Sequence, residues 1–250
     1  MVKRGTTLPK RLKNDAIIEA LLEIRFESKT FFEVFLGRLV DHPYWKGLQK
    51  QELPAYSIPA QLRLIDPNMR YAPILELRGS DDKSALRIGR SVVSYHRRAP
   101  YDGWEKFKPE LERVIVSLFA AAENVSVKRI GLRYMNALTP QIHFIGSISD
   151  LDLKLEVSGD PILGNVNINF TTNVGDESSC TVRIATREFT LGNLPQDTSL
   201  FVDVDVFTNE GYTAVNENAI KEWIEFAHTQ EKTEFFRLFK QESIDKLRED

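Results

Sequence analysis

The chain has 250 residues, which suits one large domain or two closely associated halves. It is 42% hydrophobic and 28% charged, so it can bury a core and is not a disordered chain. Its 33 basic and 36 acidic residues give a net charge of −3. Nucleic-acid-binding proteins usually have an excess of basic residues, so this near balance argues against nucleic-acid binding. A local basic patch is still compatible with it.

Cysteine usage and the N-terminus predict a soluble, cytoplasmic protein. Cys180 is the single cysteine, so no internal disulfide can form, and we expect it to be a packed strand residue. The basic segment 1–14 lacks the apolar core of a signal peptide. No apolar run approaches the ~20 residues of a membrane span. We therefore expect a basic arm over 1–14, one domain over 15–250, and no membrane partner.

The first two elements follow from hydrophobic periodicity. Residues 16–27 could form a helix or a strand, and their period of two favours a strand with its even-numbered residues on one face. Apolar residues within 31–39 have helical spacing. Ser28 or Thr30 is expected to cap this helix.

The segment from about 57 to 98 has the pattern of a meander. Turn residues separate three strand candidates, QLRLID, APILELRG and SALRIGRSVVSYHRR. Apolar residues at helical spacing then predict a helix from 104 to about 122.

The second half repeats this order loosely. Its strand candidates are VKRIGLRYMNAL, DLKLEV, NVNINFTT, CTVRIATRE and LFVDVDVF, and its end is helical. Short turns between consecutive strands imply antiparallel pairing. The expected fold class is therefore α+β, a curved and mainly antiparallel sheet with helices packed on one face. The halves 15–124 and 125–250 are expected to be structurally similar.

The segment RRAPYDGWEKFK at 97–108 combines basic, aromatic and turn residues. Asp102 and Glu105 have the spacing of a capping box, and Trp104 begins the apolar stripe of the following helix. These helix-start signals do not account for Arg97, Arg98 and Tyr101, which are therefore candidate binding residues.

Alternation in LFVDVDVF places Asp203 and Asp205 on one strand face, about 7 Å apart by the rise of a strand. Two carboxylates could serve a metal-dependent hydrolase of nucleotides or phosphodiesters, or they could form ion pairs on a solvated face. The four histidines are dispersed, and no GxSxG, GxxxxGK[ST] or GxGxxG motif occurs. We therefore favour a protein that is not an enzyme, with no metal and no cofactor.

Three segments, NDAIIEALLEIRFE, PYDGWEKFKPEL and KRIGLRYMNAL, together resemble a sporadically distributed prokaryotic family of about 250-residue proteins with no assigned function. The likeness covers the first 140 residues best. Asp15 stands where the family tends to have proline. The family-like positions are Glu19, Arg25, Tyr101, Gly103, Trp104, Arg129, Arg133, Tyr134 and Asn136. The family's patchy distribution implies an accessory gene, such as those in phage-defence or toxin–antitoxin clusters.

Each of these positions also has a structural interpretation. Tyr134 and Asn136 share the apolar face of their strand, where a buried asparagine is expected to bind neighbouring backbone. Arg129 and Arg133 face the other way and could pair with Glu19, Glu23 or the two aspartates. If Arg97, Arg98, Arg129 and Arg133 instead converge on Tyr101, they would bind a small anionic ligand or a partner segment. Asp102, Trp104 and Arg25 are expected to support the structure.

The leading hypothesis is thus a binding or accessory protein that recognises a protein partner, such as a neighbouring gene product, or a small anionic ligand. Self-assembly is a further alternative. The C-terminal segment FFRLFKQESIDKLRED is amphipathic and could pack on its own core or on a second subunit.

Overall fold

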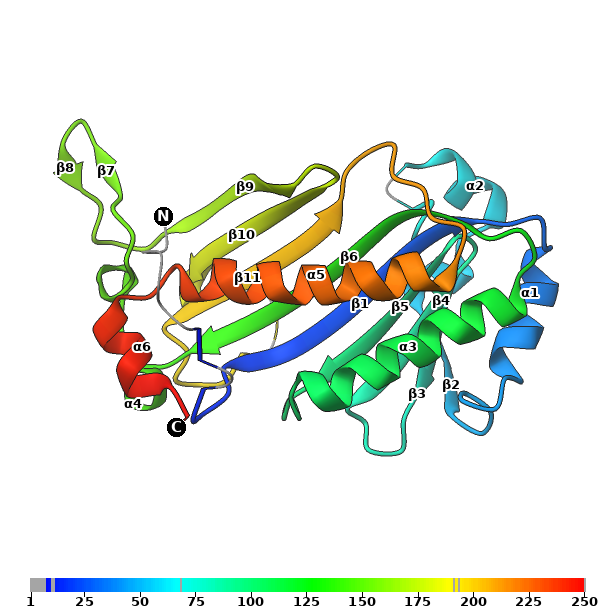
Figure 1. The fold of residues 1–250 in the computed structure, drawn as a ribbon, viewed down its shortest axis with the longest axis horizontal. Helices are drawn as coiled ribbons and strands as arrows, with labels where there is room; N and C mark the ends of the chain where they lie inside the picture. Colours follow the sequence, from blue (N-terminus) through cyan, green and yellow to red (C-terminus); the bar gives the residue numbers. More distant parts are fainter. Residues whose placement is uncertain (1–7, 10–11, 68, 191, 193, 250) are drawn as a thin grey trace.

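The computed structural model describes residues 8–9, 12–67, 69–190, 192 and 194–249. Its main feature is a nine-stranded sheet in the order β2-β3-β4-β5-β1-β6-β11-β10-β9, and every neighbouring pair is antiparallel. The expected α+β class is confirmed (Figure 1). The strands of this sheet are β1 (Ile17–Glu27), β2 (Gln49–Glu52), β3 (Leu75–Arg78), β4 (Ser84–Gly89), β5 (Val92–Arg98), β6 (Ser126–Leu138), β9 (Asn167–Gly175), β10 (Ser178–Thr186) and β11 (Leu200–Thr208).

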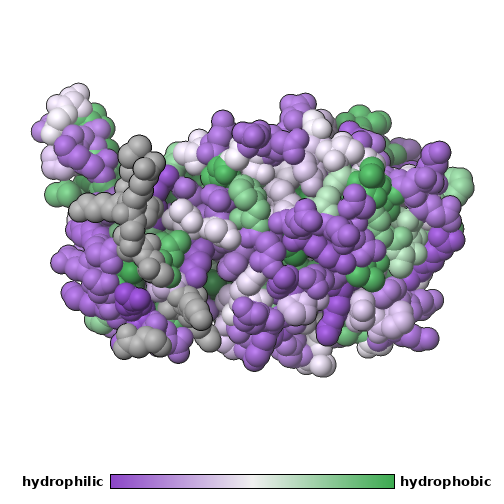
Figure 2. Space-filling view, in the orientation of Figure 1, coloured by the Kyte–Doolittle hydropathy of each residue, from purple (hydrophilic) through white to green (hydrophobic). Residues whose placement is uncertain are grey.

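The described α-helices pack mainly on one face of this sheet. Both long helices, α3 and α5, cross that face, and α1 lies beside α3 (Figure 1). Their outward sides are mostly polar in Figure 2. Within the described residues, no helix is both long and apolar enough to cross a membrane. The helices are α1 (Phe32–Val40), α2 (Ala60–Ile65), α3 (Trp104–Ala121), α4 (Pro140–His143), α5 (Glu217–Phe236) and α6 (Gln241–Leu247).

The strand order is similar on the two sides of the boundary between β1 and β6, except that the β1 side has the additional edge strand β2. Each of these central strands is flanked by the last strand of a meander, β5 beside β1 and β11 beside β6. Each meander then continues into a long helix on the same sheet face, α3 or α5. This topology supports the proposal of two similar halves.

Alternation decides which side chains form the core. On β1, Ala20, Leu22, Ile24 and Phe26 are buried beneath the helices, as predicted. Cys180 is a buried strand residue, and burial raises the pKa of its thiol to about 12. Such a thiol is inert at neutral pH.

The C-terminal segment packs on its own chain. All five of its predicted apolar anchors are buried in the core: Phe235, Phe236, Phe239, Ile244 and Leu247. Part of the predicted arm 1–14 lies outside the described residues. Leu12, however, is buried and pairs with Arg248, which ties this end of the arm to the C-terminus.

Two strand predictions were wrong. The segment QLRLID forms α2 and a following turn, with Leu62, Leu64 and Ile65 exposed. The position beside β3 belongs instead to β2, QKQE, whose four residues are all exposed and polar. An edge strand without apolar residues gives no hydrophobic signal. In DLKLEV only Glu156–Val157 is extended, as β7 of a small hairpin with β8 (Asp160–Pro161).

Both predicted helix caps were also wrong. The N-cap of α1 is Phe31, while Thr30 Oγ1 accepts a hydrogen bond from the Glu123 backbone N–H at 2.8 Å. The N-cap of α3 is Gly103, whose φ of 93° lies in the left-handed region that favours glycine. Asp102 does not cap the helix because its carboxylate binds Arg97 at 2.8 Å.

Candidate functional site

The predicted binding residues do not converge. Tyr101 is buried on the helix-covered side of the sheet, where its hydroxyl lies 3.2 Å from that of Tyr134. Arg129 and Arg133 alternate with the buried residues of β6 and therefore point to the opposite face. The sheet itself separates Tyr101 from these two arginines.

Arg97 and Arg98 also lie on opposite faces. Arg97 binds Asp81 at 3.1 Å and Asp102 at 2.8 Å, so it braces the turn before α3. Arg98 lies on the face opposite the helices and makes no side-chain hydrogen bond or ion pair to another described residue. Alternation along one continuous strand over 84–98 would put Arg87 on the face of Arg97. The turn at Arg90 divides this segment into β4 and β5, so Arg87 instead shares a face with His96 and Arg98.

The two aspartates are held by arginines. Arg133 donates from Nε and Nη2 to the carboxylate of Asp203 at 2.7 and 2.5 Å, a bidentate pair. Arg129 lies 3.6 Å from Asp205 and 3.0 Å from Glu23. Burial nevertheless raises the pKa of Asp205. Among the described residues, no three His, Cys, Asp or Glu side chains gather as a metal site.

The remaining family-like positions on this face join the same network. Arg25 Nε donates to Glu23 at 2.7 Å, and its guanidinium lies 4.5 Å from the ring centre of Tyr71. Glu19 lies 2.7 Å from Nδ1 of His96. Burial opposes ionisation of Glu19, but the hydrogen bond with His96 lowers its pKa overall. We call this side, with its strand-borne charges from Glu76 to Asp205, the network face.

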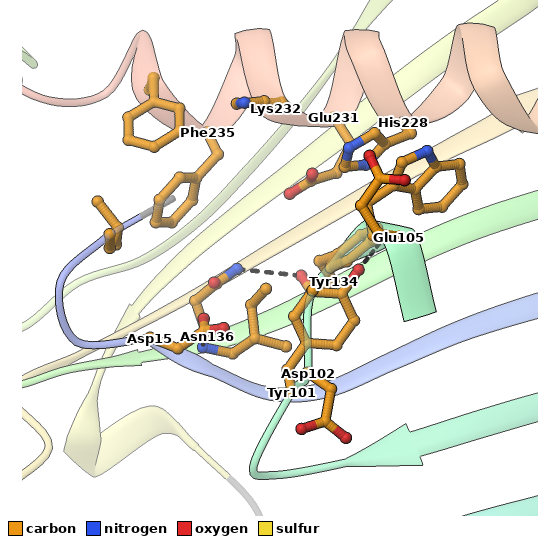
Figure 3. Close-up of a pocket in the computed structure, with 15 residues that line it drawn as sticks. Asp15, Tyr101, Asp102, Glu105, Tyr134, Asn136, His228, Glu231, Lys232 and Phe235 are labelled. Atoms are coloured by element: carbon orange, nitrogen blue, oxygen red, sulfur yellow. Dashed lines mark hydrogen bonds between the residues drawn. The ribbon is translucent and has the colours of Figure 1, made fainter. Parts of the chain in front are cut away.

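A pocket of about 480 Å³ opens on the other side of the sheet. It lies between α5, β6, the residues just before β1 and the turn into α3 (Figure 3). Its volume falls within the usual range of small-molecule sites, about 300–1,000 Å³. The lining includes the predicted residues Tyr101, Asp102, Gly103, Trp104, Tyr134 and Asn136.

Asn136 forms part of the pocket floor. Its Nδ2 donates to the backbone carbonyls of Tyr134 at 3.4 Å and Val202 at 3.2 Å, as expected of a buried amide. The β6 backbone and the neighbouring strand are thereby held together directly below α5. The floor of the pocket is therefore fixed by hydrogen bonds rather than by packing alone.

Glu231 is the pocket residue whose burial the packing of the fold does not explain. It is 6% exposed, and its carboxyl group has no hydrogen bond or ion pair with any described residue. Figure 3 shows the group pointing from α5 into the space above Asn136 and the tyrosines. Burial raises its pKa to about 8, with the nearby charge of Asp15 acting in the same direction and Lys232 against it.

His228 and Trp104 form one wall beside it. Their rings stack with centroids 4.0 Å apart and planes at 9°. Burial lowers the pKa of His228 to about 4, so the ring is neutral at pH 7. Its Nδ1 is buried with no partner among the described atoms. Trp104 Nε1 donates to Glu225 at 3.2 Å, which fixes the orientation of this wall.

Neither Glu231 nor His228 was predicted as a site residue, although the sequence contains a signal for Glu231. The apolar stripe of α5 runs through Ile220, Ile224 and Ala227 and resumes at Phe235. Glu231 stands four residues after Ala227 and four before Phe235, where the helical period calls for an apolar residue. A carboxyl group at such a position is either paired with a hydrogen-bonding partner or made neutral by a raised pKa.

No protein-family model matches this sequence, and no curated protein matches it either.

Proposed function

We propose that this chain is a binding protein without catalytic activity and that its binding site is the pocket beneath α5. The observation that carries this proposal is the buried side chain of Glu231, whose carboxyl group has no hydrogen bond or ion pair with the described residues and points into a pocket of about 480 Å³. A ligand that donates a hydrogen bond to this carboxyl group gains an interaction that the described residues do not supply.

The pocket walls are consistent with this role. They combine aromatic rings with a few convergent polar groups, the usual composition of a ligand site. The occupant is either a free small molecule or a side chain of a protein partner, such as a neighbouring gene product, in the cytoplasm. The network face is the weaker candidate because its carboxylates are already bound by arginines.

The test is a ligand-observed NMR screen of small molecules with the full-length protein, repeated with Lys232→Trp. Lys232 lines the pocket on α5, and a tryptophan there is expected to obstruct it. Lys221→Trp, three turns earlier on the same helix and outside the pocket, is the matched control. We expect hits that Lys232→Trp loses and Lys221→Trp keeps. A screen in which no hit distinguishes the two variants would refute the proposal.

A further inference from the structure

The charges of the pocket indicate what it binds. Among the described residues that line it, four are acidic and one is basic, namely Asp15, Asp102, Glu105 and Glu231 against Lys232. Two of the acids are committed to the fold, since Asp102 binds Arg97 and Asp15 accepts a hydrogen bond from the Ile17 backbone N–H at 3.0 Å. Glu231 and Glu105 form no ion pair with any described residue.

These two carboxyl groups lie at different depths. Glu105 is exposed at the start of α3, whereas Glu231 is buried between α5 and the sheet. Figure 3 shows both pointing toward the same space. A ligand that enters past Glu105 therefore reaches Glu231 at the inner end of the pocket.

Aromatic rings surround the path between them. Tyr101 and Tyr134 meet edge to face with centroids 5.7 Å apart, and Phe235 and Trp104 line the adjoining walls. Ring faces attract cations, and the attraction is stronger where water is excluded. An anion at the same place would face two carboxyl groups and the electron-rich ring faces.

We propose that the pocket binds an organic cation, a primary ammonium or guanidinium group, with Glu231 as its buried counter-ion and the rings of Tyr101 and Tyr134 as its walls. This inference rests on the proposed function. It departs from the anionic ligand expected from the sequence, because the arginines that suggested it lie elsewhere. The cation is either a free amine or the side chain of a lysine or arginine in a partner.

Binding of such a cation is coupled to proton release. With its pKa near 8, Glu231 carries a proton at pH 7 while the pocket holds no cation. A cation favours the carboxylate, so the carboxylic acid loses its proton to solvent as the ion pair forms. The other titratable or charged groups that line the pocket around it are Asp15 before β1, Tyr101 and Asp102 before α3, Glu105 on α3, Tyr134 on β6, and His228 and Lys232 on α5.

Three probes of one size test the charge preference. They are 2-phenylethylamine, 2-phenylethanol and phenylacetate, which share a ring and differ in the charge of the head group. Isothermal titration calorimetry at pH 7 in phosphate and in Tris separates binding heat from buffer ionisation. We expect the amine to bind at least tenfold more tightly than the other two and to release close to one proton.

Three carboxyl variants assign the effect to a residue. Glu231→Gln is expected to weaken amine binding at least tenfold and to abolish the buffer dependence, because the charge-assisted contact and its proton are both lost. Glu105→Gln, at the exposed mouth, should weaken amine binding less than Glu231→Gln because water screens its charge. Glu222→Gln, an exposed carboxyl group of α5 outside the pocket, is the matched control and should leave the affinity unchanged. Agmatine and an end-blocked peptide with one lysine, used as further probes, distinguish a free cation from a partner's side chain.

The outcomes separate this inference from the proposed function. If phenylacetate or 2-phenylethanol binds and the amine does not, the pocket is a binding site but the cation inference is wrong. Amine binding that Glu231→Gln leaves unchanged overturns the inference in the same way. If none of these probes binds at millimolar concentration, the cation inference fails, while the proposed function stands or falls with the ligand screen on Lys232→Trp and Lys221→Trp.

Discussion

Charged side chains on the two faces of the central sheet differ in whether they are paired. On the network face, ion pairs join most of the charges, and the buried carboxylate of Glu76 is held by both Arg78 and Arg87 at 2.6 and 2.8 Å. On the helix-covered face, the buried side chain of Glu231 and the half-buried ring of His228 have no such partner among the described residues.

This difference separates charges that are paired within the fold from charges that are not. A paired network fixes the positions of strands and side chains and adds little net stability. An unpaired buried acid destabilises the folded protein whenever it ionises, so fold stability alone does not account for it. The contrast directs the search for function to the pocket beneath α5 and away from the more numerous charges of the network face.

The largest expected effect comes from removing the acid on the helix-covered face. Burial raises the pKa of Glu231 from 4.5 to about 8, so the folded state holds this proton more tightly than the unfolded state does. Stability contributed by the proton is fully present below pH 4.5 and is lost as the pH rises toward 8. Glu231→Gln removes this loss. The difference in the free energy of unfolding between the variant and wild type should therefore grow by roughly 3 kcal/mol, in favour of the variant, as the pH rises from 5 to 8.

Urea denaturation at pH 5, 6, 7 and 8 measures this gain as a difference between the two proteins. Other acids with raised pKa values contribute to both curves and cancel in the difference. Glu105→Gln, which removes an exposed carboxyl group from the same pocket, should keep the wild-type trend. A Glu231→Gln curve parallel to that of wild type would show that the unpaired acid does not distinguish the two faces.

The next effect comes from unpairing an acid on the network face. Arg133→Met leaves the carboxylate of Asp203, 5% exposed, without its bidentate partner. We expect a loss of about 2–3 kcal/mol in the free energy of unfolding at pH 7, because the remaining charge stays buried.

The double variant Arg133→Met with Asp203→Leu sharpens this result. Removing both charges leaves no uncompensated ion, so stability should return to within about 1 kcal/mol of wild type. A double variant that loses as much as the two single variants combined would mean that the pair is not coupled. In that case the network face would owe its stability to packing.

Part of the difference between the two faces of the sheet can be predicted from the sequence. Period-two alternation identifies which residues of β1 and β6 are buried, because each strand exposes one face to the core and the other to the network. It also places Tyr134 and Asn136 on the core face, where they line the pocket. The family-like turn into α3 supplies three more pocket residues, Tyr101, Gly103 and Trp104.

Residues brought together by the long helix could not be paired from the sequence. The stacking of Trp104 on His228 joins residues 124 positions apart, and nothing in the periodicity of α5 fixes its position along the sheet. The faces on which Arg87 and Arg97 lie could not be assigned from the sequence for a related reason. A continuous strand over 84–98 would place Arg87 and Arg97 on one face, but the turn at Arg90 resets the alternation and puts them on opposite faces.

A smaller effect is expected from the hydrogen bond between the two pocket tyrosines. Burial raises the pKa of both phenols, so they stay neutral at physiological pH. Tyr101→Phe leaves the fully buried hydroxyl of Tyr134 without this partner and should cost about 1 kcal/mol. Thermal denaturation measures the cost. Adding Tyr134→Phe should recover part of it, and a double variant that is less stable still would contradict the role of this bond.

The smallest effect belongs to a surface ion pair outside both regions. Arg38 and Glu123 lie 3.3 Å apart, but their side chains are 47% and 69% exposed. Water screens such a pair, so Arg38→Met should change the free energy of unfolding by less than about 0.5 kcal/mol. The variant repeats the substitution made at Arg133, but its partner carboxylate is exposed and joined by a single contact. Equal losses at the two positions in urea denaturation would show that the cost at Arg133 comes from the arginine side chain itself. A large loss at Arg133 alone would show that the cost comes from the buried charge of Asp203, which is left without its partner.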